Sequence, residues 1–114
     1  MDEKEIEKIK EEIKKFKEKI GADKLIIFGS FARGNFNEHS DIDVLIVNKK
    51  FRGKRFYDRL RGLWLKWPLD LPADFICYTP EEFEKLKKEV SIVSEAIREG
   101  VEIEDNSKIV LLQI

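Results

Sequence analysis

Residues 25–34 read LIIFGSFARG, and residues 40–47, a few positions further on, read SDIDVLIV. The first segment is a short apolar run that ends at Gly29. The second segment places two carboxylates at the head of another apolar run. Short apolar runs bounded by small and polar residues are typical of buried β-strands. The two segments therefore predict two core strands, with a turn of small residues after the first.

Four residues of these segments suggest a site. The side chains of Asp41 and Asp43 would share one face of an extended strand, about 7 Å apart along the chain. Carboxylate oxygens are ligands that Mg²⁺ prefers. Gly29 lacks a Cβ, so a phosphate could approach the backbone there. Ser30 is expected to cap a short helix, whose first N–H groups would suit a triphosphate. We therefore expect a metal-dependent nucleotide site.

These residues resemble the signature of the nucleotidyltransferase superfamily, which includes DNA polymerase beta and the aminoglycoside nucleotidyltransferases. The string GSFARG at residues 29–34, with SDID at residues 40–43, is similar to the minimal nucleotidyltransferase branch of bacteria and archaea. The resemblance covers residues 24–100. It implies a small mixed β-sheet packed with helices, an α/β or α+β fold, with the active site at one end of the sheet. The direction of the strands is not readable from the residues.

The resemblance also implies a reaction. A nucleoside monophosphate, expected to be AMP from ATP, would pass to a hydroxyl acceptor with the help of two Mg²⁺ ions, for which Mn²⁺ could substitute. Members use a third carboxylate on a neighbouring strand, and the run ADFICY at residues 73–78 offers Asp74, whereas the competing Asp70 lies in a Pro-rich loop. The expected catalytic and metal-binding residues are Asp41, Asp43 and Asp74. The expected nucleotide-binding residues are Gly29, Ser30 and Arg33, although Arg33 could equally form a surface salt bridge.

The acceptor is expected to be a protein. A chain of 114 residues predicts one domain, residues 1–114, with an amino-terminal helix at 1–21, a core at 24–100 and a carboxyl-terminal strand or tail at 101–114. The minimal branch is commonly encoded beside a small helical HEPN-type partner, and acts as the antitoxin of a toxin–antitoxin pair, in some cases by attaching AMP to the toxin. The alternative is a non-catalytic module that binds a partner toxin or a nucleotide without turnover.

Composition excludes several classes of protein. Charged residues make up 39% of the chain, and their near balance leaves a net charge of −1. No apolar run approaches the roughly 20 residues that span a bilayer, and the charged start does not resemble a signal peptide, so we expect a cytoplasmic protein without a membrane partner. The single cysteine, Cys77, falls in a predicted core strand and is expected to be inert.

Helical periodicity predicts the elements around these strands. Apolar residues three and four apart at residues 2–20 predict an amphipathic helix that ends at Gly21 and packs on the sheet. A capping box at Thr79 begins a second helix that is expected to run to Ile97, with Ser91 as a candidate break, before a short strand at 101–103. The apolar residues 108–114 predict an edge strand or a subunit contact, and therefore a candidate homo-oligomer.

Residues 49–67 combine eight basic side chains and one acid with five aromatic rings. Such a mixture can bind phosphates and stack on bases. The apolar residues of its second half, however, recur at helical spacing, which favours a buried helix face with the arginines on the solvent side. The residues at this spacing are Phe56, Leu60, Leu63, Trp64 and Trp67. Nucleic acid is therefore the partner that we expect least, and the lone loop residue His39 is given no catalytic role.

Overall fold

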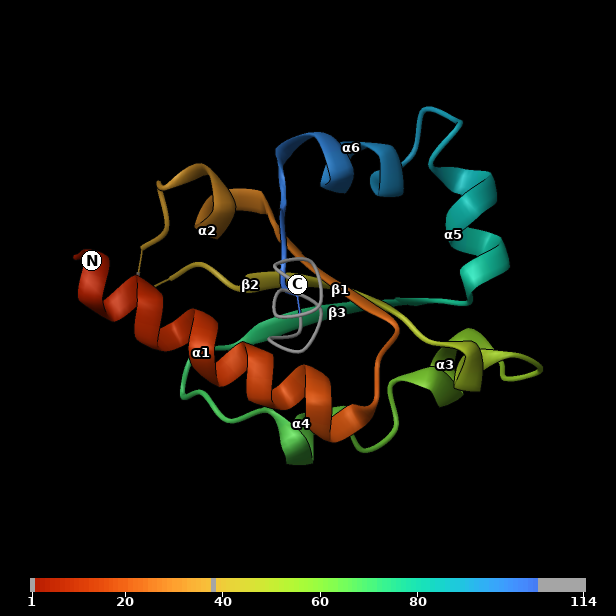
Figure 1. Cartoon of the computed structure of the whole chain (residues 1–114), viewed down its shortest axis with the longest axis horizontal. Helices are drawn as coiled ribbons and strands as arrows, with labels where there is room; N and C mark the ends of the chain where they lie inside the picture. The colour runs from red at the N-terminus through yellow and green to blue at the C-terminus, as the bar shows by residue number, and fades with distance from the viewer. Residues whose placement is uncertain (1, 38, 105–114) are drawn as a thin grey trace, which may run out of the picture.

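The computed structural model describes residues 2–37 and 39–104, which form a four-stranded sheet with helices on both faces (Figure 1). The elements are α1 (Glu3–Ile20), β1 (Lys24–Phe28), α2 (Gly29–Arg33), β2 (Ile42–Val47), the 3₁₀ helix η1 (Lys49–Phe51), α3 (Phe56–Arg59), α4 (Leu63–Lys66), β3 (Ala73–Tyr78), α5 (Pro80–Leu86), α6 (Ile92–Glu99) and β4 (Val101–Glu102). The strand order is β3-β2-β1-β4. β1 is antiparallel to β2 and β4, whereas β2 and β3 are parallel. The mixed α/β fold predicted from the resemblance is confirmed.

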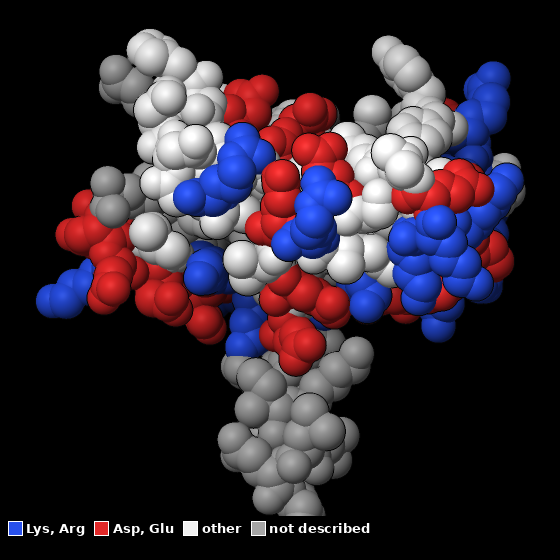
Figure 2. Space-filling view, turned by 90° about the horizontal axis from the view of Figure 1, so that it is seen from above, with Lys and Arg blue, Asp and Glu red and all other residues white. Residues whose placement is uncertain are grey.

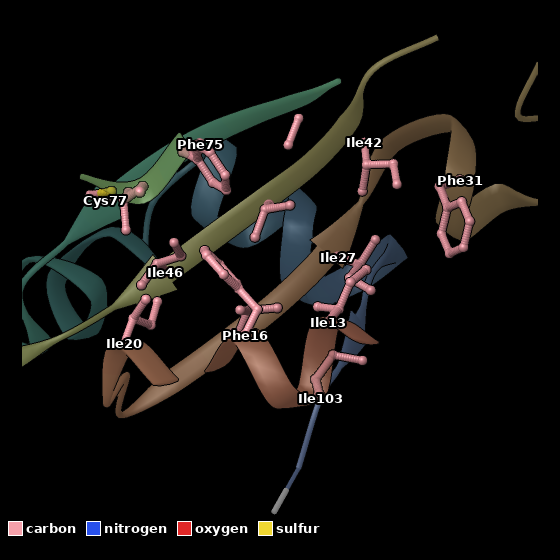
Figure 3. Packing of buried hydrophobic residues seen from close by; sticks show 14 of the residues in the cluster. Ile13, Phe16, Ile20, Ile27, Phe31, Ile42, Ile46, Phe75, Cys77 and Ile103 are labelled. Carbon is pink, nitrogen blue, oxygen red and sulfur yellow. The ribbon is translucent and has the colours of Figure 1, made fainter. Parts of the chain in front are cut away.

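One face of the sheet packs against α1. Ile13 and Phe16 of this helix are almost fully buried, and Figure 3 shows them pointing at side chains of the strands. The ring of Phe16 lies 5.8 Å from that of Phe75 on β3 and 5.1 Å from that of Trp67. The amphipathic helix predicted for residues 2–20 is therefore confirmed. It ends where predicted, at Gly21, whose φ of 67° lies in the left-handed region that favours glycine.

The opposite face packs against α5 and α6. Phe83, Val93 and Ala96 of these helices contact Ile26 and Leu45 of the central strands in a second hydrophobic cluster. Because both faces are covered, β1 and β2 are apolar almost throughout and show little of the alternation expected of a half-exposed strand. Only the ends of the strands are left for polar chemistry.

The predicted second helix is divided in two. The capping box is confirmed, because the Glu82 N–H donates to Thr79 Oγ1 at 3.2 Å and the Thr79 N–H donates to the Glu82 carboxylate at 2.8 Å. The helix stops after Leu86, and Ser91 begins α6 by accepting the Ser94 N–H at 3.2 Å. The continuous helix to Ile97 was therefore wrong, and the candidate break at Ser91 is where the second helix begins.

The helix expected between residues 56 and 67 was also wrong. Two short helices, α3 and α4, flank a turn in which Gly62 adopts φ 80°. This left-handed residue redirects the chain, so the predicted apolar stripe does not form one face. Phe56 and Trp64 are 52% and 55% exposed, whereas Arg59, expected on the solvent side, is 8% exposed.

Charged side chains of both signs are interspersed on the face formed by α2, α5 and α6 (Figure 2), as the balanced composition leads one to expect. None of the helices in residues 2–37 and 39–104 is long and apolar enough to cross a membrane. The predicted strand or contact at residues 108–114 lies outside the described residues.

Candidate active site

The ends of three strands lie side by side at one end of the sheet. β1 is antiparallel to β2, so the last residue of β1, Phe28, pairs with Asp43 near the start of β2. β3 is parallel to β2, so Asp74 near its start pairs with Asp43 from the other side. Paired positions on neighbouring strands lie about 5 Å apart and share a face of the sheet. Strand direction thus brings Asp43 and Asp74 together although 30 residues separate them in the chain.

The carboxylate of Asp43 occupies the space over Gly29. Gly29, the first residue of α2, is buried and has a φ of 73°. A Cβ on this residue would lie 2.0 Å from Oδ2 of Asp43 and 3.0 Å from its Cγ. Real Cβ atoms are not found so close to another heavy atom. Any side chain at position 29 would therefore strain the backbone turn and would also force the Asp43 carboxylate to move.

The pKa of Asp43 is raised above its ordinary value. Burial is the largest cause, the negative charges of Asp74 and Asp41 add to it, and the positive charge of Arg33 opposes it. This pattern shows that all three carboxylates act on the same small region. Asp41 lies one residue before β2 and is exposed, and Asp74 is exposed on β3. A divalent cation among them would relieve the repulsion, so the residues present fit Mg²⁺.

The carboxylates do not form a complete metal cage on their own. Among the described residues, no three Asp, Glu, His or Cys side chains converge closely enough to hold an ion by themselves. Mg²⁺ in nucleotide enzymes is commonly held by one or two carboxylates together with substrate phosphates and water. The three carboxylates at this end of the sheet therefore suit an ion that binds together with its nucleotide.

Ser30 is not the cap of α2, as the sequence had predicted. The N-cap is Phe28, and Ser30 is the second residue of the helix, half-buried. Because the Phe28 side chain accepts no capping hydrogen bond, it leaves the N–H groups of the first turn to other acceptors. Ser30 thus lies two positions beyond the N-cap position at which it was expected, next to Gly29.

Arg33 forms the surface salt bridge that the sequence left open as one of its two roles, and its contact with a nucleotide phosphate stays a prediction. Its Nη1 lies 3.0 Å from Oε2 of Glu99 at the end of α6, and its charge also lowers the pKa of Asp43. Glu99 was missed by the sequence analysis, because nothing local links it to a residue 66 positions earlier. The pair joins α2 to α6 beside the carboxylates.

Two other residues considered in the sequence lie outside this group. Asp70 is exposed in the loop before β3 and is not among the charges that shift the pKa of Asp43. Cys77 is buried in β3, and burial raises the pKa of its thiol to about 12. The thiol is therefore protonated at neutral pH, as expected of an inert core cysteine.

The chain belongs to the nucleotidyltransferase domain family. The sequence model of that family matches residues 6–103, which include every residue of the site just described. Two proteins of Methanocaldococcus jannaschii are similar to it. "Putative protein adenylyltransferase MJ0141" is 32% identical over 97 residues, covering 80% of this chain and 94% of that protein. "Putative protein adenylyltransferase MJ1305" is 44% identical over 66 residues, covering 55% and 44% of the two chains.

A solved structure has the same fold. A Sulfolobus solfataricus protein described as a "putative nucleotidyltransferase" superposes with a TM-score of 0.61 at 22% identity. The match covers 90% of this chain and 86% of that chain. At this level of identity the likeness supports the fold, while the family assignment rests on the sequence comparison.

Proposed function

We propose that the protein transfers AMP from ATP to a hydroxyl group of a protein acceptor. The single observation that carries the proposal is the convergence of Gly29, Asp43 and Asp74 at one end of the sheet, with the Asp43 carboxylate against the glycine. The family supports nucleotidyl transfer, and the names of the two M. jannaschii relatives support a protein as the acceptor.

In the proposed reaction, the acceptor oxygen attacks the α-phosphorus of ATP. A new O–P bond forms, the bond from the α-phosphorus to the bridging oxygen breaks, and pyrophosphate leaves. Two Mg²⁺ ions, when bound, would stabilise the leaving group and lower the pKa of the attacking hydroxyl. Asp41 and Asp43 would hold both ions, and Asp74 would hold the one nearer the acceptor.

The proposed roles of Asp74, Gly29, Ser30 and Arg33 are based on where these residues lie in the site. In the proposal, Asp74 accepts the proton of the acceptor hydroxyl; its exposure on the outer strand supports this role. The Gly29 N–H and the Ser30 hydroxyl would bind the β- and γ-phosphates. Arg33, already close enough to affect Asp43, would exchange part of its contact with Glu99 for a phosphate oxygen.

Calorimetric titration of ATP, with and without Mg²⁺, tests the site. We expect Mg²⁺-dependent binding to the wild type and at least a tenfold loss of affinity in the Asp41→Asn, Asp43→Asn double variant. Asp70→Asn is the matched control, because it removes an exposed carboxylate that does not affect Asp43. Equal binding by the wild type and the double variant would show that the site is misassigned.

Catalysis needs a separate measurement. Pyrophosphate release on addition of ATP, Mg²⁺ and a candidate acceptor protein should accompany labelling of that protein by α-phosphate-labelled ATP. Nucleotide binding without release or labelling would favour the alternative, a partner-binding module without turnover.

A further inference from the structure

A cleft lies at the opposite end of the sheet from the carboxylates. β2 begins beside the candidate active site and ends at Val47, toward the side of the molecule where α3 lies (Figure 1). The residues that line the cleft come mostly from the segment that follows β2. Its volume is about 590 Å³. Five basic side chains line it, which are Lys50, Lys54, Arg59, Arg61 and Lys66. We call it the α3–α4 cleft.

Three of these cations are not neutralised. Arg59 pairs with Glu82, and Arg61 lies 3.5 Å from Asp58. Within residues 2–37 and 39–104, the ammonium groups of Lys50, Lys54 and Lys66 form no ion pair. The α3–α4 cleft therefore carries a net positive charge in a protein whose overall charge is −1.

The backbone that carries these lysines is held in place. The Lys50 N–H donates to the side chain of the buried Asn48 at 3.0 Å. Nε of the buried Arg59 donates to the carbonyl of Lys54 at 3.1 Å, and its Nη1 donates to the carbonyl of Cys77 at 3.2 Å. The buried guanidinium thus fastens the Lys54 loop to β3, and the cleft is a built feature of the fold.

Exposed aromatic rings adjoin the cleft. A hollow of about 340 Å³ shares Arg61 and Gly62 with it and is lined by Tyr57 and Trp64. Tyr57 is 87% exposed and Trp64 is 55% exposed. Nucleic acid was the least expected partner because Phe56, Trp64 and Trp67 were predicted to lie on a buried helix face. Trp67 does pack against the core, but Phe56 and Trp64 are more than half exposed.

We propose that the α3–α4 cleft and its aromatic hollow bind single-stranded nucleic acid. Phosphates contact Lys50, Lys54 and Lys66, and unpaired bases stack on Tyr57 and Trp64. A duplex is disfavoured because its bases have no free faces to stack. An acidic protein is disfavoured because protein interfaces have an apolar centre and a charged rim, whereas here the lysines line the hollow and the rings lie beside it.

The test uses a fluorescein-labelled uridine oligonucleotide of about 12 residues and the full chain, measured by fluorescence anisotropy. We expect affinity to fall about twentyfold from about 50 to about 200 mM salt, as three phosphate contacts predict for a single strand. A Lys50→Gln, Lys54→Gln, Lys66→Gln variant should lose most of this salt dependence. The matched control is Lys4→Gln, Lys8→Gln, Lys19→Gln, which removes the same charge from exposed positions on α1.

The stacking contacts are tested one at a time. Tyr57→Ala should weaken binding at least fivefold, in line with the loss of one base stack. Trp64→Ala should do the same, but its ring also packs 4.7 Å from that of Phe75, so Tyr57→Ala is the variant that leaves the core intact. The Asp41→Asn, Asp43→Asn variant should keep full affinity, because its carboxylates lie at the other end of the sheet.

Three results would overturn the proposal. Equal affinity in the cleft and control lysine variants would show that the lysines of the cleft do not contact phosphates. Loss of binding in the Asp41→Asn, Asp43→Asn variant would place the oligonucleotide in the candidate active site. Displacement by polyglutamate at the same charge concentration as the oligonucleotide would identify the cleft as a surface for an acidic protein.

Discussion

At the scale of single residues, the carboxylate of Asp43 occupies the space that a side chain at Gly29 would need. Two glycines allow this contact to be separated from backbone strain. Gly29 and Gly34 both have positive φ, 73° and 82°, but a Cβ on Gly34 would meet nothing within 4 Å. The two positions therefore carry a similar conformational cost for any other residue and differ in the space available.

Alanine at each glycine should separate the two effects. Gly34→Ala should cost about 1 kcal/mol of unfolding free energy, the ordinary strain of a side chain at positive φ. Gly29→Ala should cost about 2–4 kcal/mol, since the Asp43 carboxylate must also move, and it should abolish Mg²⁺-dependent ATP binding. Urea denaturation and calorimetry measure the two quantities. Equal costs in the two variants would show that the carboxylate moves aside freely.

Asp43 should also make stability depend on pH. Its pKa is raised in the folded protein, so between the ordinary value of 3.8 and the higher folded value the native state binds more protons than the unfolded chain. Stability therefore falls as pH rises through this window and stays reduced at neutral pH. Asp43→Asn should raise the melting temperature at pH 7, and the gain should disappear below about pH 3.8. The control Asp70→Asn should leave the melting temperature unchanged at both pH values.

At the scale of elements, the region of α3 and α4 is held by one buried arginine. Arg59 donates to two backbone carbonyls and to Glu82, and so links α3 to β3 and α5. Arg55, four residues earlier, is exposed and pairs with Asp58 at 3.2 Å. A local pattern cannot distinguish the two arginines, because the partners of Arg59 lie up to 23 residues further along the chain.

Truncation of the two arginines to alanine should reduce the free energy of unfolding by different amounts. Arg59→Ala should reduce the free energy of unfolding by about 2–3 kcal/mol, because Glu82 and two carbonyls lose their donor. Arg55→Ala should change it by less than about 0.5 kcal/mol, as expected for an exposed ion pair. Urea denaturation of both variants measures the difference. A cost for Arg55→Ala as large as that for Arg59→Ala would contradict the anchoring role.

At the scale of the whole molecule, two hydrophobic clusters lie on opposite faces of one sheet. Phe16 belongs to the cluster under α1, and Phe83 belongs to the cluster under α5 and α6. The two rings belong to different clusters because alternate residues of each strand point to opposite faces. The faces are therefore independent in packing, although β1 and β2 contribute to both.

Substitutions on the two faces should reduce the free energy of unfolding additively, and the protein should still unfold in one cooperative transition. Phe16→Leu and Phe83→Leu should each cost about 1 kcal/mol. The double variant should lose the sum to within about 0.5 kcal/mol, with a single urea transition of unchanged slope. A change of slope, or a second transition, would show that the faces unfold separately.

The sequence by itself determined the elements whose signals are local. The α1 periodicity, the Gly21 stop, the Thr79 capping box and the apolar strands all act within a few residues, so each could be read before the fold was known. The small-residue turn with paired carboxylates also identified the family. For the second helix, the sequence showed Ser91 only as a candidate break. A serine can either begin a new helix as its cap or lie inside a continuous one, and the local sequence does not decide between the two.

Only the tertiary structure decided which distant residues meet. The parallel pairing of β2 with β3 brings Asp74 beside Asp43, and the antiparallel pairing with β1 places Asp43 against Gly29. The exposure of Phe56 and Trp64 and the burial of Arg59 were likewise missed, since helical periodicity does not record the turn at Gly62. Hydrogen-bond register and packing act between residues far apart in the chain, and no local pattern encodes them.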